Sequence, residues 1–208
     1  MPTNTFINLD KDKKDKIIEA ALNQFSEKQY EQVNISDIIK TAKIPRGSFY
    51  QYFNDKEDLY LHLISGIRDK KMQFLEEDIN NSENLRFIDL IKKLYMDGVR
   101  FAIKYPKYVK MMDFLLKNRN QIYDKIMKDN LLIAENLYAS LIEKDKAKGY
   151  IKKDIDTRTF AKIVVQLTSN IAIEELNLEN EEESYQKMLE QNEKVLKIIE
   201  YGVLERTI

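Results

Sequence analysis

The stretch Arg46-Gly47-Ser48-Phe49-Tyr50-Gln51-Tyr52-Phe53 decides the fold, because its apolar and polar residues separate at helical spacing. Phe49 and Phe53 stand four residues apart, so on a helix they share a face and can anchor it against a core. Pro45 suits the start of this helix, since a proline lacks the N–H that would be unpaired there. The predicted helix, Arg46 to Phe53, leaves these side chains on or beside its outer surface: Arg46, Ser48, Tyr50, Gln51 and Tyr52.

Two more short helices are predicted just before this stretch. Apolar residues at helical spacing run from Ile17 to Phe25 and mark the first. The second starts at Asn34, whose side chain can cap it together with Asp37, and it ends near Ala42. Lys43 and Ile44 then form a tight turn. Three short helices, the last two joined by such a turn, have the size and spacing of a helix-turn-helix.

The outer residues of the third helix have the chemistry of DNA contacts. An arginine can pair bidentately with O6 and N7 of guanine, and a glutamine can pair with adenine. Gly47 lets the backbone approach a duplex closely, while tyrosine hydroxyl and lysine ammonium groups suit phosphate oxygens. The net charge is only −1, so this prediction depends on position along the chain and not on overall basic charge.

The rest of the chain also points to helices. Only 5 Gly and 3 Pro occur in 208 residues, which leaves few turn-forming positions and favours long helices. Apolar residues recur at helical spacing almost throughout, and nothing reads as a strand. We therefore predict an all-α fold of about nine helices, with a three-helix bundle at the N-terminus and a larger helical part after it.

Composition disfavours several classes of function. The absence of Cys excludes disulfides, thiolate metal sites and Cys nucleophiles, and the single histidine, His62, excludes a site with two imidazoles. We expect no enzymatic activity, no cofactor and no metal. The first residues are polar rather than an apolar signal segment, and no run approaches the roughly 20 apolar residues of a membrane span. We therefore expect a cytoplasmic protein with no membrane contact.

The larger part of the chain carries two groups of apolar residues with open alternatives. An aromatic and Met-rich set either fills a core or lines an apolar ligand pocket, and it includes Tyr95, Phe101, Met111, Met112, Phe114, Tyr123 and Tyr138. The last two predicted helices carry apolar stripes that either complete the core or form a dimer interface. Those residues are Phe160, Ile163, Val164, Leu167, Ile171, Met188, Val195 and Ile199.

The N-terminal pattern resembles the DNA-binding signature of the tetracycline-repressor (TetR) family over about residues 11 to 65. The resemblance rests on Asp37-Ile38, Ala42, Gly47-Ser48-Phe49-Tyr50, Tyr52-Phe53, Lys56-Glu57 and Leu59. It implies that the third helix enters the major groove, and that residues 1–56 form a helix-turn-helix DNA-binding domain. Residues 57–208 would form a helical domain that binds a small ligand and dimerises.

The resemblance also implies residue roles. The base-reading positions would be Ser36, Arg46, Gly47, Ser48 and Gln51, and the phosphate-binding positions Asn34, Lys43, Tyr50, Tyr52 and Lys56. Lys43 departs from the pattern, because a glycine is usual in that turn. A left-handed conformation there would cost a non-glycine residue on the order of 1 kcal/mol.

Together these features predict a ligand-responsive transcriptional regulator, a repressor that binds a pseudo-palindromic DNA operator as a homodimer. A small organic inducer would release it by binding one of two conformations more tightly. The alternative is a DNA-binding protein of the same fold that organises the nucleoid or recruits another protein without an inducer. An enzyme that uses the helical pocket is a third class, without a recognisable nucleophile and base.

Overall fold

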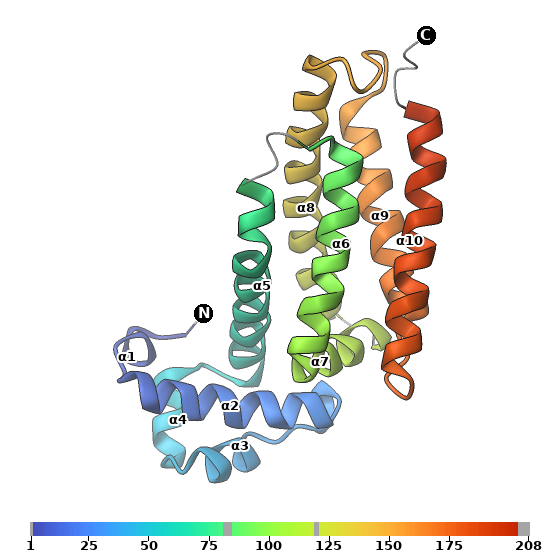
Figure 1. Cartoon of the computed structure of the whole chain (residues 1–208). Helices are drawn as coiled ribbons and strands as arrows, with labels where there is room; N and C mark the ends of the chain where they lie inside the picture. The colour runs from blue at the N-terminus through green and yellow to red at the C-terminus, as the bar shows by residue number, and fades with distance from the viewer. Residues whose placement is uncertain (1, 81–84, 119–120, 204–208) are drawn as a thin grey trace. The chain divides into compact units, whose positions relative to one another are not determined.

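The chain is helical throughout the part that the structure describes. The computed structural model describes residues 2–80, 85–118 and 121–203. Within these residues lie ten α-helices, one short 3-10 helix and no β-strand (Figure 1). The predicted all-α fold is confirmed. The additional helix is α1 (Asn4–Ile7), which forms in a stretch that sequence patterning predicts as a polar lead-in.

The chain divides into two compact units. Unit 1 comprises Met1–Gln73 and Ala102–Arg119, and unit 2 comprises Phe74–Phe101 and Asn120–Ile208. The predicted functional division at residue 56 stays a prediction. Helix α5 (Lys56–Asn80) begins in unit 1 and ends in unit 2, and α6 (Phe87–Lys104) begins in unit 2 and ends in unit 1.

Unit 1 is a bundle of short helices around an aromatic and aliphatic core. Its elements besides parts of α5 and α6 are α1, α2 (Lys11–Glu27), η1 (Tyr30–Gln32), α3 (Ile35–Ala42), α4 (Arg46–Tyr52) and α7 (Pro106–Lys117). Helix α2 packs against both α3 and α7. The Lys107 ammonium donates to Oδ1 of Asn23 at 2.6 Å, which joins α7 to α2. Side chains exposed by 1% or less fill the interior, among them Ile17, Phe25, Ile38, Phe49, Phe53 and Leu59.

Local side-chain caps fix where the helices of unit 1 begin. The Asp10 carboxylate accepts from the Lys13 N–H at 2.9 Å and caps α2. At α5, the Asp55 carboxylate accepts from the Asp58 N–H at 2.8 Å, and the Asp58 carboxylate accepts from the Asn54 N–H at 3.1 Å. The first bond caps the start of α5 at Asp55, and the second ties the preceding turn to the same helix. The end predicted for the Arg46 to Phe53 helix agrees with the structure to one residue, because α4 ends at Tyr52 with Phe53 as its C-cap.

Unit 2 consists of long helices that lie side by side (Figure 1). They are most of α6, with α8 (Gln121–Ala147), α9 (Thr157–Glu175) and α10 (Glu181–Val203). Its core includes Phe87, Leu90, Ile91, Ile142, Phe160, Val164 and Leu196. The buried Asp145 carboxylate accepts from the Phe87 N–H at 2.6 Å and so caps the start of α6.

Two turns of unit 2 can be read against the sequence. Gly149 follows α8 with φ +77°, a left-handed conformation that suits glycine at the end of a helix. The acidic stretch Glu179 to Glu183 has the composition of a loop, but Glu181–Glu183 form the first turn of α10. Carboxylates there are stabilised by the helix dipole. The polar stretches 80–84 and 118–120 also have the composition of loops, and they lie mostly outside the described residues. No helix of the described part is long and apolar enough to cross a membrane.

Candidate nucleic-acid interface

The turn between α3 and α4 is closed by hydrogen bonds and contains one left-handed residue. Lys43 has φ 54° and ψ 43°, and among the described non-glycine residues it is the one with positive φ. The Lys43 N–H donates to the Lys40 carbonyl, and the Ile44 N–H donates to the Ile39 carbonyl at 3.2 Å. These bonds satisfy carbonyls at the end of α3. The left-handed conformation considered for Lys43 is therefore present.

Relieving this left-handed residue should stabilise unit 1. We expect Lys43→Gly to raise the free energy of unfolding by roughly 0.5–1 kcal/mol, because the strain it removes exceeds the entropy that glycine adds to the unfolded chain. Lys40→Gly, one turn earlier in the right-handed helix, should instead lower it by about 1 kcal/mol or less. Urea unfolding of both variants measures this. Destabilisation by both would contradict the strain at Lys43.

Helix α4 buries one side and exposes the other. Phe49 and the following Phe53 are fully buried and anchor the helix, as predicted. On the outer side Arg46, Gly47 and Gln51 are exposed. The Tyr50 side chain is 50% exposed, and Ser48 is half-buried. Helix α4 thus presents a guanidinium, an amide and a phenol together on one solvent-facing side.

Helix α3 adds two exposed polar residues to this region, Asn34 and Ser36. Asn34 occupies the N-cap position of α3, but its side chain makes no capping hydrogen bond. The capping pair predicted between Asn34 and Asp37 is therefore wrong. Asp37 instead lies 4.0 Å from the Lys28 ammonium. The Asn34 amide is exposed to solvent, where a phosphate contact is sterically open to it.

The outer position predicted for Tyr52 is wrong. Its side chain is only 3% exposed, and its ring lies 6.0 Å from that of Phe6 in α1. The Lys13 ammonium lies 5.8 Å above the Tyr52 ring. A residue on α4 three positions after Phe49 shares its inner face, and α1 covers that face. These contacts support a packing role rather than a phosphate contact.

Lys56 points toward the protein rather than toward a partner. Its ammonium donates to the carbonyls of Tyr30 at 2.8 Å and Val33 at 3.0 Å, and it reaches that of Glu31 at 3.4 Å. It also lies 4.4 Å above the Tyr30 ring. Lys56 therefore ties η1 to the start of α5. The phosphate contact predicted for it would require breaking these bonds.

Removing this tie should cost stability. We expect Lys56→Ala to lower the free energy of unfolding by about 2 kcal/mol, because it leaves backbone carbonyls without a charged donor. Lys40→Ala, an exposed lysine on α3, should change it by no more than about 0.5 kcal/mol. Chemical denaturation of the full chain measures both. If Lys56→Ala unfolds like the wild type but binds DNA more weakly, the ammonium serves DNA and not the fold.

The residues predicted to line a ligand pocket are divided between the two units. Tyr95, Phe101, Tyr123 and Tyr138 belong to unit 2, and Met111, Met112 and Phe114 belong to unit 1. Burial raises the pKa of Tyr95, and the charges of Glu175 and Tyr138 raise it further. Burial also raises the pKa of Tyr138 to about 12. Both phenols therefore stay protonated and can donate hydrogen bonds.

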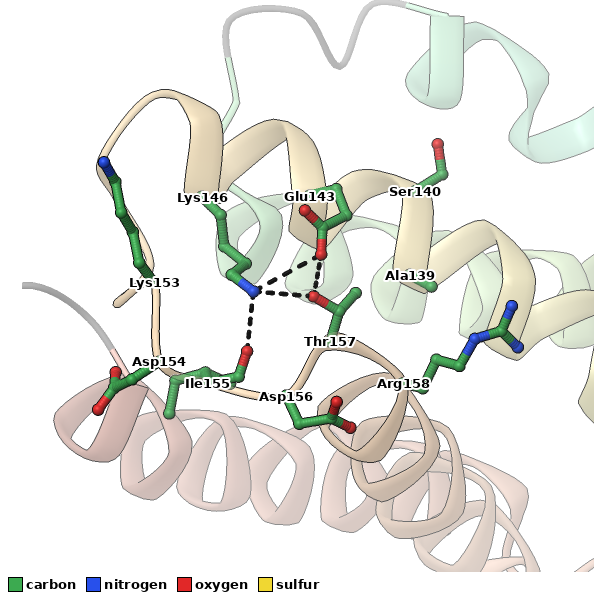
Figure 2. A pocket seen from close by; sticks show the side chains of 10 residues that line it. All are labelled: Ala139, Ser140, Glu143, Lys146, Lys153, Asp154, Ile155, Asp156, Thr157 and Arg158. Carbon is green, nitrogen blue, oxygen red and sulfur yellow. Dashed lines mark hydrogen bonds and ion pairs between the residues drawn. The ribbon is translucent and has the colours of Figure 1, made fainter.

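A pocket of about 670 Å³ lies elsewhere in unit 2, where α8 ends and α9 begins (Figure 2). None of its lining residues belongs to the predicted pocket set. The Lys146 ammonium at its floor donates to the Ile155 carbonyl at 2.8 Å and to Thr157 Oγ1 at 3.1 Å, and lies 3.6 Å from Glu143. The charges around it balance, with Lys146, Lys153 and Arg158 against Glu143, Asp154 and Asp156. These bonds join the segment between α8 and α9 to both helices. Because the charges balance, the pocket does not favour a ligand of either charge.

The residues predicted for a dimer interface mix two faces of α9 and α10. Phe160, Val164, Ile171 and Met188 are at most 9% exposed and belong to the core of unit 2, while Val195 and Ile199 are half-buried. Ile163 and Leu167 are 44% and 38% exposed. Sequence patterning missed Ile198 and Tyr201, which are 73% and 70% exposed on α10. Both residues are apolar or aromatic and stand at helical spacing, so the pattern was present in the sequence. The residues predicted on α10 instead follow its core-facing side.

Comparisons with known proteins agree with this architecture. The family model for bacterial regulatory proteins of the tetR family matches residues 17–63, which include α3 and α4. The fatty acid metabolism regulator protein of Bacillus subtilis (strain 168) is 30% identical over 149 residues, covering 68% of this chain and 72% of that protein. An uncharacterized HTH-type transcriptional regulator, YdgC, from the same organism is 26% identical over 159 residues, covering 75% and 77%.

Solved structures extend the likeness to the whole chain. A TetR family transcriptional regulator from Chloroflexus aurantiacus J-10-FL shares 27% sequence identity, covers 99% of this chain and 100% of its own, and gives a TM-score of 0.66. The similarity thus includes the long helices of unit 2 as well as the helix-turn-helix. This chain belongs to the tetR family of bacterial regulatory proteins and is a transcriptional regulator, not an enzyme.

Proposed function

We propose that this regulator is a repressor that binds a pseudo-palindromic DNA operator as a homodimer and is released by a small organic ligand. It would act in the cytoplasm, where its operator is. The main support for this proposal is the outer side of α4, where Arg46 and Gln51 are exposed. On the inner side, Phe49 and Phe53 are buried and anchor the helix. Arginine and glutamine side chains on a helix held in this way suit the edges of guanine and adenine in the major groove.

The surroundings of α4 support the same assignment. A Cβ at Gly47 would meet no atom within 4 Å beyond its chain neighbours and the backbone of its own helix, so packing does not require a glycine there. Close approach of the α4 backbone to a DNA duplex would require one. Ser36, Ser48 and Gly47 complete the proposed base-reading set. Asn34, Lys43 and Tyr50 are exposed and are the proposed phosphate contacts.

The proposed dimer would use the outward side of α9 and α10. On α9, Ile163 and Leu167 are exposed and lie one helical turn apart. On α10, Ile198 and Tyr201 are also exposed and lie one turn apart. Exposed apolar residues at helical spacing mark a surface that a partner covers. A second copy is the partner that the proposed operator requires, because two reading helices must reach half-sites about 34 Å apart.

The proposed ligand would bind in unit 2. Within the described residues, the Tyr95 hydroxyl is buried without a hydrogen-bond partner. An unpaired buried hydroxyl costs about 1–3 kcal/mol, so a ligand that pairs with it gains that stabilisation. Tyr138, also in unit 2, is a second phenol whose pKa is raised by burial, so an apolar molecule with polar groups suits this region. The relative named as a fatty acid metabolism regulator makes fatty acids the first set of probes.

Two measurements test the proposal on the full chain. Selection from a library of random 30-base-pair duplexes should yield one enriched inverted repeat, and footprinting should protect both halves. Thermal shift with a panel of apolar organic acids, beginning with palmitate, should find a compound that raises Tm and releases the selected duplex. Failure to enrich any sequence would overturn operator recognition. If a repeat is enriched but no compound releases the protein from it, only the proposed response to a small ligand is overturned.

A further inference from the structure

The C-terminal end of α4 is closed by residues from the beginning of the chain. The Thr3 N–H donates to the Tyr52 carbonyl at 3.0 Å, and Thr3 Oγ1 donates to the Gln51 carbonyl at 2.5 Å. Both carbonyls belong to the last turn of α4, where a helix has no partners of its own for them. A residue 48 positions earlier therefore completes the hydrogen bonding of this helix.

Phe6 fixes the same segment through its ring. Its side chain is 3% exposed, and its centroid lies 4.6 Å from that of Phe53 and 5.4 Å from that of His62 on α5. The Thr3 hydroxyl also accepts from the Phe6 N–H at 3.4 Å, so the hydrogen bonds and the ring belong to one small structure. We call the segment Thr3 to Ile7 the N-terminal clasp.

Helix α4 needs such a contact because it is short. It has seven residues, and a helix of that length has no appreciable stability in isolation, so tertiary contacts decide its orientation. The clasp holds the carbonyl of Gln51 itself, whose side chain is a proposed base reader. Bidentate base contacts require side chains placed within about 0.5 Å, whereas phosphate contacts tolerate more variation.

We propose that Thr3 and Phe6 are positioning residues for base reading. The N-terminal clasp fixes the end of α4, and sequence-specific binding depends on it more than binding to phosphates does. This inference rests on the proposed function, in which α4 reads the operator. It adds to that function a determinant of specificity that lies outside the helix-turn-helix and touches no base.

The test compares two threonines in the same segment of the full chain. Thr3→Val keeps the shape of the side chain and removes its hydroxyl, while Thr5→Val makes the same change at an exposed residue of α1. The probes are the duplex that the wild type selects from the random library and a scrambled duplex of equal length. Amide hydrogen exchange at Gln51 to Phe53 reports the clasp without DNA, and Tm reports overall stability.

For Thr3→Val we expect affinity for the selected duplex to fall roughly five- to tenfold, with affinity for the scrambled duplex unchanged within about twofold. Exchange at the end of α4 should become faster, and Thr5→Val should match the wild type. Phe6→Leu, which keeps an apolar side chain, should reduce the same ratio of selected to scrambled binding.

Three results would overturn the inference. Equal losses on both duplexes would show general damage to the fold. Unchanged binding of the selected duplex despite faster exchange would show a clasp that does not position α4. Unchanged exchange in Thr3→Val would show that the bond from the Thr3 hydroxyl to the Gln51 carbonyl does not hold α4. If the wild type selects no sequence at all, the proposed function has failed, and that outcome is separate from all three.

Discussion

If the proposed dimer forms, the double substitution Ile163→Glu with Leu167→Glu should convert it into a folded monomer and lower operator affinity roughly 100-fold or more. Both side chains are partly exposed, so the change removes little from the core of unit 2. It places two carboxylates where two apolar surfaces would meet, and desolvating them is costly. Without the dimer, each half-site binds alone and the gain from linked binding is lost. Light scattering gives the mass, and titration of the selected duplex gives the affinity.

Ile133→Glu is the matched control for this experiment. Ile133 is 46% exposed on α8, so the same chemical change occurs at similar exposure on a helix that the proposed interface does not use. This control should remain dimeric and bind the duplex like the wild type. If the double variant stays dimeric and binds with full affinity, the dimer interface lies on another surface. If it is monomeric and still binds with full affinity, operator binding does not need a dimer.

Arg46→Ala should weaken binding to the selected duplex by about 1–3 kcal/mol and abolish the preference at one base pair of each half-site. Arg46 is exposed in the first turn of α4, so the loss reflects contact with DNA rather than with the core. Repeating the selection with the variant, together with titration of duplexes altered at single positions, measures both effects.

Lys43→Ala is the control, because Lys43 is exposed three residues before Arg46 and is a proposed phosphate contact. It should weaken selected and scrambled duplexes alike, and lower the dependence of log affinity on log salt by about one unit. Sequence-independent losses from both variants would contradict a base-reading role for Arg46. A shift in preference caused by Lys43→Ala would exchange the two assignments.

The sequence predicted the part of the fold in which local signals agree. Pro45, the apolar pair Phe49 and Phe53, and the break at Asn54-Asp55 together define α4 and its neighbours. Each acts within a few residues, through backbone restriction, helical spacing or capping. The left-handed conformation of Lys43 follows from the resemblance rather than from a local signal, because the family pattern has a glycine at this turn position.

Other features depend on contacts distant in the chain, and sequence patterning missed them. Helix α1 has four residues and one buried apolar side chain, Phe6, which gives no detectable helical period. Tyr52 and Lys56 have side chains that suit either DNA or the interior. Their inward positions are set by α1 and η1. For α9 and α10, two apolar faces lie side by side, and helical spacing alone does not separate the core from the outer surface.

The N-terminal clasp has a consequence for how this regulator can be recombined with its relatives. The family-model match starts at residue 17, so a chimera built from the matched region would carry α4 without Thr3 and Phe6. Such a graft would take its first residues from another protein, whose side chains were not selected for the carbonyls of Gln51 and Tyr52. Transplanting DNA preference from this chain should therefore require a donor segment that begins no later than Thr3.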